Sequence, residues 1–339
     1  MYILSRAVVF AMFSSCAPTE IPPERTEITR LLALGGNAFS IHRTDHFLIA
    51  SDCDDSVLSP LADRLEATYQ AVVRFAEDLK FPMHPPPDLL PVLLFNRHSD
   101  FVRYAHTVEF NDLSVPGFYH PRNNTAAYCN VSDLPQLLDI SQRIEKAEAP
   151  ERIIDWRSQR DAIVETFNRL VIQHEAAHQV LFNIGVLSRE VDNPDWLVEG
   201  LACQFEVNSG EAGNQMRLAD FREAQAGAAS AATAGQADRR FLSLADLVAD
   251  HEFNVPDESK RIIRYAQAWA LVDYLSRTRG EALAAYLRSI AGRPPNMRAN
   301  REQRITEFQS VFGPMDQACE QLWIESVLKL PSVPRPHRQ

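Results

Sequence analysis

Short apolar runs alternate with periodic apolar positions along the first third of the chain. Residues 46–50 and 89–95 are apolar runs bounded by polar or proline-rich turns, so each predicts a buried strand. Between them, apolar side chains recur about every 3.6 residues over 58–79, which predicts an amphipathic helix ended by Pro82. A shorter helix is expected over 99–106. The chain therefore begins by alternating strand and helix.

A hairpin is predicted next. Residues 117–120 and 125–131 flank the sequence Pro-Arg-Asn-Asn at 121–124. This spacing and turn composition are typical of two antiparallel strands joined by a tight connection.

The pattern becomes helical from about Glu151 onward. One apolar stripe over 167–181 includes His174 and His178, so this helix is expected to be partly buried. Residues 224–237 are rich in Ala, Gly and Ser without a periodic apolar face, and they are expected to be a flexible insertion. Further helices are predicted over 261–276, 281–291, 301–312 and 315–328.

These patterns predict an α+β protein. We expect an α+β lobe with a small mixed sheet at 28–150, a mainly helical lobe at 151–330 and a loose tail at 331–339. The chain has 339 residues and is 45% hydrophobic, enough for a large core. Its formal net charge of −11, with no run of Lys or Arg, disfavours nucleic acid or an anionic membrane surface as the main partner.

Residues 1–27 are expected to form an export or lipoprotein signal followed by a linker. Arg6 precedes an apolar run at 7–13 that is too short to span a bilayer, so no transmembrane helix is expected. Ser14, Ser15 and Cys16 follow, in the order typical of a short secretion signal. The segment also resembles the lipobox of bacterial lipoproteins, which implies a lipid anchor at Cys16. Export and a cytoplasmic location both stay open.

The sequence His174-Glu175-Ala176-Ala177-His178 carries the candidate chemistry. Two histidines four residues apart lie on one helix face, about 6 Å apart along the axis, and can share one cation. Glu175 then projects beside the metal, where it can act as a general base toward water. The alternative is an ordinary pair of histidines on an amphipathic helix.

A second helix follows at 193–202. Asn193 is expected at the N-cap and Pro194 at the first helical position. Catalytic zinc sites keep three protein ligands and one open position, so Glu199 is placed to supply the third ligand. Cys203 and Glu206 lie on the same helix face, and Glu206 stays open as a rival ligand.

The motif HEAAH, then twenty residues, then Glu199 within WLVEGLACQFE resembles the gluzincin zinc metallopeptidases. It is similar to the aminopeptidase N type, with HExxH, eighteen residues and WLNEGFASYFE, and more closely to uncharacterised bacterial gluzincins with WLxEGLA. The resemblance covers about 171–206. It implies His174, His178 and Glu199 as ligands of one Zn2+ and Glu175 as the base.

Residues 265–270, Tyr-Ala-Gln-Ala-Trp-Ala, resemble an aminopeptidase segment whose tyrosine stabilises the oxyanion of the tetrahedral intermediate. The resemblance implies this role for Tyr265. A buried aromatic residue at a helix start is the alternative.

The resemblance also implies a thermolysin-like core with zinc in a cleft between the two lobes. In gluzincins an edge strand upstream of the motif pairs with the peptide substrate, and the hairpin at 117–131 could supply it. The GxMEN segment, with which aminopeptidases hold the substrate's amino terminus, is not found in this sequence. The expected activity is therefore zinc-dependent peptide hydrolysis, as an endopeptidase. A zinc-stabilised binding or scaffold protein and a hydrolase of non-peptide amides are the alternatives, and Glu175 and Tyr265 count against the scaffold.

Overall fold

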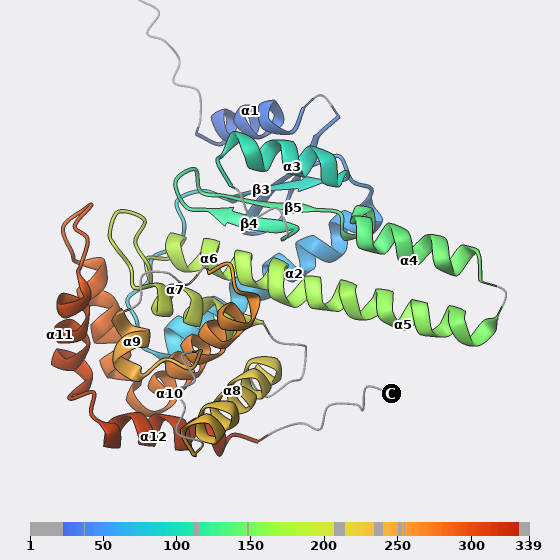
Figure 1. Ribbon diagram of the computed structural model, residues 1–339. Coiled ribbons are helices and arrows are strands. Elements are labelled where there is room, and N and C mark those ends of the chain that lie inside the picture. The colour runs from blue at the N-terminus through green and yellow to red at the C-terminus, as the bar shows by residue number, and fades with distance from the viewer. Residues whose placement is uncertain are drawn as a thin grey trace, which may run out of the picture.

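The chain has an α+β fold in which a five-stranded mixed sheet, with helices from the N-terminal half, adjoins a large helical region (Figure 1). This computed structural model describes residues 23–36, 38–110, 115–147, 149–206, 214–233, 240–249, 253 and 255–331. The predicted fold class is confirmed. The expected signal, the lipid anchor at Cys16 and residues 332–339 of the expected tail lie outside the described residues. Of the helices in the described ranges, none is long and apolar enough to cross a membrane.

The sheet has the strand order β1-β2-β3-β5-β4. The inner strands β2 (Phe47–Ser51), β3 (Leu90–Phe95) and β5 (Thr125–Cys129) are parallel, and both outer strands run antiparallel to their neighbours. Strand β4 (Gly117–His120) forms the predicted hairpin with β5 and lies at one edge. The other edge strand, β1 (Ser40–Arg43), was not predicted, because its four residues carry no strong apolar pattern.

Helices cover both faces of the sheet (Figure 1). One face packs against α1 (Pro23–Gly35) and α3 (His98–Thr107). The other face packs against α2 (Asp55–Asp78) and α6 (His174–Asn183), the helix that carries the HExxH motif. Helix α1 begins inside the stretch that was expected to be a linker up to residue 27.

Strand β3 shows why its sequence is one continuous apolar run. Successive side chains of a strand point to opposite faces. Leu93 and Phe95 enter the core beside α1 and α3, whereas Val92 and Leu94 enter the core beside α2 and α6. A strand buried on both faces has no polar side to alternate with, so its pattern is apolar throughout.

The motif helix is the last part of a long helical stretch. Helix α5 (Pro150–Phe167) leads through one π-helical segment, η2 (Asn168–Gln173), directly into α6. Helices α4 (Pro135–Glu145) and α5 extend together away from the rest of the molecule as an arm (Figure 1). Helix α4 was not predicted.

The helical region contains six further α-helices in the described residues. They are α7 (Asp195–Ala202), α8 (Gln215–Thr233), α9 (Leu244–Ala249), α10 (Glu258–Ala291), α11 (Arg301–Phe312) and α12 (Gln317–Leu328). The two helices predicted at 261–276 and 281–291 are joined as α10, with a non-helical residue, Arg279, at the kink between them.

The prediction of a flexible insertion at 224–237 is wrong for residues 224–233, because these residues continue α8. Leu218, Phe221 and Ala224 form a buried face that fixes the helix from its first turns. Alanine, which dominates the later turns, has the highest helix propensity and needs no apolar partner to stay helical. Residues 234–237 lie outside the described residues.

Helix α7, which carries Glu199, lies directly against α10. A Cβ atom at Gly200 would stand 2.5 Å from the backbone oxygen of Ala268 in α10. Only glycine allows the two helix backbones to approach this closely. Gly200 therefore allows α7, and with it Glu199, to pack closely against α10.

We predict that Gly200→Ala lowers the free energy of unfolding by about 1 to 3 kcal/mol, because the added methyl group overpacks the α7–α10 contact. Gly280→Ala is the matched control in α10, since its Cβ would meet only the end of the Leu79 side chain, at 3.3 Å. Denaturant unfolding measures both changes. Equal stability of the two variants would contradict this account of the contact.

Candidate metal centre

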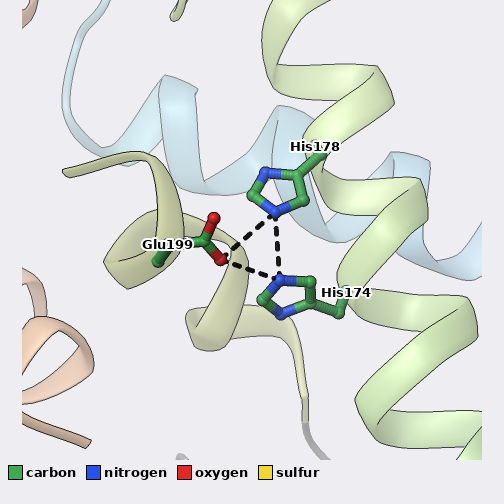
Figure 2. Close-up of side chains that lie close together, drawn as sticks. All are labelled: His174, His178 and Glu199. Atoms are coloured by element: carbon green, nitrogen blue, oxygen red, sulfur yellow. Dashed lines mark hydrogen bonds and ion pairs between the residues drawn. The ribbon is translucent and has the colours of Figure 1, made fainter. Parts of the chain in front are cut away.

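Three side chains from α6 and α7 converge on one point (Figure 2). The Nε2 atoms of His174 and His178 lie 3.0 Å apart. The Oε2 atom of Glu199 is 3.1 Å from Nε2 of His174 and 3.5 Å from Nε2 of His178. Both imidazoles are buried and Glu199 is half-buried.

The separations fit a shared metal ion. Ligands about 2.0 to 2.2 Å from a tetrahedral zinc ion stand roughly 3.3 to 3.6 Å from one another. The observed distances of 3.0, 3.1 and 3.5 Å are close to that range. Two imidazole nitrogens and one carboxylate oxygen suit zinc and similar divalent ions. His174, His178 and Glu199 therefore form a group that could hold a metal ion, as the sequence predicted.

The Glu199 carboxyl is ionised at neutral pH. Burial alone would raise its pKa, but the charge of His178 and hydrogen bonds with His174 and His178 lower the pKa well below its usual range. An ionised carboxylate that is partly withdrawn from water favours a compensating cation nearby. This preference supports the assignment of Glu199 to a cation site.

Glu206 contacts the other side of His174. Its Oε1 atom lies 2.9 Å from His174 Nδ1, so Nδ1 is the nitrogen that keeps its proton when His174 is neutral, and Nε2 is left to bind a metal ion beside Glu199 and His178. Burial alone would raise the pKa of Glu206, but the Arg217 charge, the bond with His174 and the bond with Arg217 lower it to about 2. Glu206, which the sequence left open as an alternative ligand, therefore contacts Nδ1 of His174, on the side away from His178 and Glu199.

Glu175 lies beside the three-residue group and contacts the sheet. Its Oε2 atom accepts a 2.8 Å hydrogen bond from the backbone N–H of Tyr119 in β4. Burial raises the pKa of the Glu175 carboxyl, and the charges of His174 and His178 partly offset this effect. A half-buried carboxylate beside the candidate metal ligands and an edge strand is suited to accept a proton from water.

Strand β4 turns its free edge toward Glu175. Its backbone pairs with β5 at Phe118 and His120, so the N–H groups of Gly117 and Tyr119 point away from β5. Gly117 also allows close packing on the helix, because a Cβ atom there would stand 2.6 Å from Cγ1 of Val171. The predicted edge strand is thus held against the segment that precedes the motif.

Two polar residues of α6, which were not singled out from the sequence, connect the motif helix to the hairpin and to β3. Gln179 Nε2 donates to the backbone oxygens of Pro91, at 2.9 Å, and Asn124, at 3.2 Å. Asn183 Nδ2 donates to Oδ1 of Asn124 at 2.7 Å. Asn124 has a positive φ of 54°, a conformation that asparagine tolerates in turns. Gln179 and Asn183 interrupt the apolar stripe of the motif helix, and this interruption was the only sign in the sequence that they make buried contacts.

Tyr265 in α10 lies at the same site. Its ring centroid is 5.9 Å from that of His174, and its side chain lines the same cavity as Glu175 and Glu199. Burial, followed by the electrostatic effects of Glu199, Cys203 and Glu175, raises the pKa of the Tyr265 hydroxyl well above its usual value. The hydroxyl is therefore a neutral hydrogen-bond donor at any physiological pH.

The cavity at the site has a volume of about 480 Å³. Its wall is mostly apolar and includes Phe110, Val115, Phe118, Leu170, Phe182, Val198 and Ile262. The carboxylates that line its described part are Glu175, Glu199 and Glu206. Each of them contacts a donor of the protein itself.

One local expectation was wrong. Helix α7 begins at Asp195 with Pro194 at the N-cap, and Asn193 does not cap it. The Asn193 side chain donates to the backbone oxygens of Ser188 and Val191 instead. These two bonds stabilise the loop that precedes α7. The different helix start does not change the position of Glu199, which faces the histidines.

We predict that Glu199→Gln lowers zinc affinity by more than about a hundredfold, because loss of a ligand costs more than loss of a residue that supports one. Glu302→Gln, at an exposed position in α11, is the control and should bind as tightly as the wild type. Competition with a coloured chelator measures both affinities. Equal affinity of the two variants would remove Glu199 from the ligand set.

Residues 169–297 are similar to the family described as Protein of unknown function (DUF1570). None of the curated proteins compared with this chain matches it. The matched segment contains α6, α7 and all of α10, and with them His174, Glu175, His178, Glu199 and Tyr265. The candidate metal centre therefore lies entirely in the part of the chain that is similar to this family.

Proposed function

We propose that this protein is a zinc-dependent peptidase that cleaves peptide bonds within a chain. The observation that carries the proposal is the position of Glu175. This carboxylate stands beside the group of His174, His178 and Glu199 and accepts a hydrogen bond from the free edge of β4. Metal ligands, a base and a strand for an extended substrate thus meet in one cavity.

Each residue then has one task. Zinc held by His174, His178 and Glu199 would supply a Lewis acid that polarises the scissile carbonyl and makes water more acidic. Glu175 accepts a proton from the attacking water and passes it to the leaving amine. The Tyr265 hydroxyl donates a hydrogen bond to the carbonyl oxygen as negative charge develops there.

Two properties of the cavity support a peptide substrate cut internally. The free edge of β4 offers backbone groups to an extended chain by strand addition. The three carboxylates in the described part of the lining all have other roles in this scheme, Glu199 as ligand, Glu175 as base and Glu206 as the partner of His174 and Arg217, so none of them is left to hold the amino terminus of a substrate. The apolar wall favours apolar side chains next to the scissile bond.

Glu175→Gln tests the proton transfer. The amide keeps an oxygen that can accept from Tyr119 N–H, so the fold and the zinc content should stay unchanged. Cleavage of an unstructured protein should fall by about 10²- to 10⁴-fold, because the base is lost. Zinc content by atomic absorption and cleavage by mass spectrometry are measured together. Parallel loss of zinc and activity would make Glu175 a ligand, and a wild type that cleaves no peptide would favour a zinc-stabilised binding protein.

Tyr265→Phe tests the oxyanion contact. The loss of one such donor typically lowers turnover by roughly a hundredfold to a thousandfold. The interaction strengthens in the transition state, so the change should appear in kcat with little change in KM. Tyr274→Phe, further along the same helix, is the matched control and should be nearly silent. Wild-type turnover in Tyr265→Phe would assign this ring to packing alone.

A further inference from the structure

A second donor group overlaps the first one at His174. The Nδ1 atom of His174, the Sγ atom of Cys203 and a carboxylate oxygen of Glu206 all lie within 4.8 Å of one another. All three residues are buried. Imidazole, thiolate and carboxylate together form a strong donor set for zinc. The same histidine therefore offers one nitrogen to each of two groups that could hold a metal ion.

The side chain of Arg217 engages the carboxylate of this inner group. Its Nε atom donates to Oε2 of Glu206 at 2.7 Å, and its Nη2 atom donates to Oε1 at 2.9 Å. Asn214 Nδ2 donates to Oε2 at 3.0 Å, and His174 Nδ1 donates to Oε1. Cys203 Sγ also donates to Oε1, at 3.6 Å. Glu206 thus accepts two hydrogen bonds on Oε2 and three on Oε1, which uses its capacity as an acceptor. A metal ion that binds this carboxylate would have to compete with the bidentate guanidinium.

Two further contacts hold Arg217 in place. The backbone N–H of Arg217 donates to Oδ1 of Asn214 at 3.0 Å. Its guanidinium carbon lies 5.3 Å from the centroid of the Tyr265 ring, within the range of a cation–π contact. The cation is therefore fixed between the inner donor group and the residue expected to contact the substrate.

We propose that Arg217 decides which of the two overlapping donor groups holds the metal ion. By binding both oxygens of Glu206, it keeps that carboxylate as the hydrogen-bond partner of His174 Nδ1. The metal is thereby confined to Nε2 of His174, to His178 and to Glu199, on the side of Glu175. Arg217 is a positioning residue in this scheme. The inference rests on the metal centre of the proposed function and is independent of whether the substrate is a peptide.

Removal of the guanidinium leaves Glu206 as an uncompensated buried carboxylate. A divalent cation bound by Glu206, Cys203 and His174 Nδ1 would restore the balance. Binding there requires the Cys203 thiol to release its proton to solvent and the proton of His174 to move from Nδ1 to Nε2, so that the charges of the metal ion, the thiolate and the Glu206 carboxylate cancel. We therefore expect the loss of Arg217 to create a thiolate-ligated metal site that the wild type does not have.

The test loads the wild type, Arg217→Met and Arg217→Met/Cys203→Ser with Co2+ and records their near-ultraviolet and visible spectra. A thiolate ligand adds an intense charge-transfer band that nitrogen and oxygen ligands do not produce. We expect no such band in the wild type, a band in Arg217→Met, and its loss in the double variant. A thiolate band in the wild type, or a wild-type spectrum for Arg217→Met, would overturn the proposal.

A second measurement covers the case in which Arg217→Met does not fold. In the wild-type background, Cys203→Ser should leave zinc affinity unchanged, whereas Glu206→Gln should lower it by about 10- to 100-fold through the loss of support for His174. A fall in affinity for Cys203→Ser would show that the inner group already holds the metal, and would overturn the proposal. Failure of the wild type to bind either metal would instead remove the metal centre itself.

Discussion

Charge compensation in the interior is the constraint on which this site depends. Glu199 and Glu206 place two carboxylates on opposite sides of one buried imidazole. Glu206 is compensated by a buried guanidinium, which binds both of its oxygens. Glu199 contacts only imidazoles among the charged partners in the described residues, and these compensate it only when they are protonated or share a cation with it. This asymmetry makes the Glu199 side of His174 the side on which a metal ion could be held.

The two histidines of α6 were predictable because their arrangement is local, whereas Glu199 of α7 was predicted from the resemblance of its motif to that of the gluzincins. A spacing of four residues places His174 and His178 on one helix face whatever the rest of the fold does. The buried strands were equally clear, since β2 and β3 are continuous apolar runs. The pairing of these strands into a mixed sheet, by contrast, depends on contacts between distant segments and has no local signal. Strand β1 and helix α1 were missed because their own patterns are weak. Helix α4 was missed although its sequence is clearly amphipathic, with Leu137 and Ile140 buried.

Arg217 could not have been connected to the site from the sequence. It lies eleven residues beyond Glu206, and it stands near the start of a helix whose later turns suggested a flexible segment. Its importance comes from the bidentate contact, which only the three-dimensional fold brings about. The role of β4 was open for a similar reason, because the Tyr119 hydrogen bond to Glu175 joins segments 56 residues apart. The segment similar to the family of unknown function, 169–297, does not include this strand.

The π-helical segment η2 lies between the α4–α5 arm and the helix of the candidate metal centre, so the direction of the arm can change without moving that centre. Helix α6 is held by the sheet, so the HExxH residues keep their orientation whatever precedes them. Each residue of an α-helix turns it by about 100°. Gain or loss of a single residue in η2 would therefore swing the arm around the helix axis and leave the ligands where they are. Chains that differ only in η2 could in this way present the arm to different surroundings while keeping the same candidate metal centre.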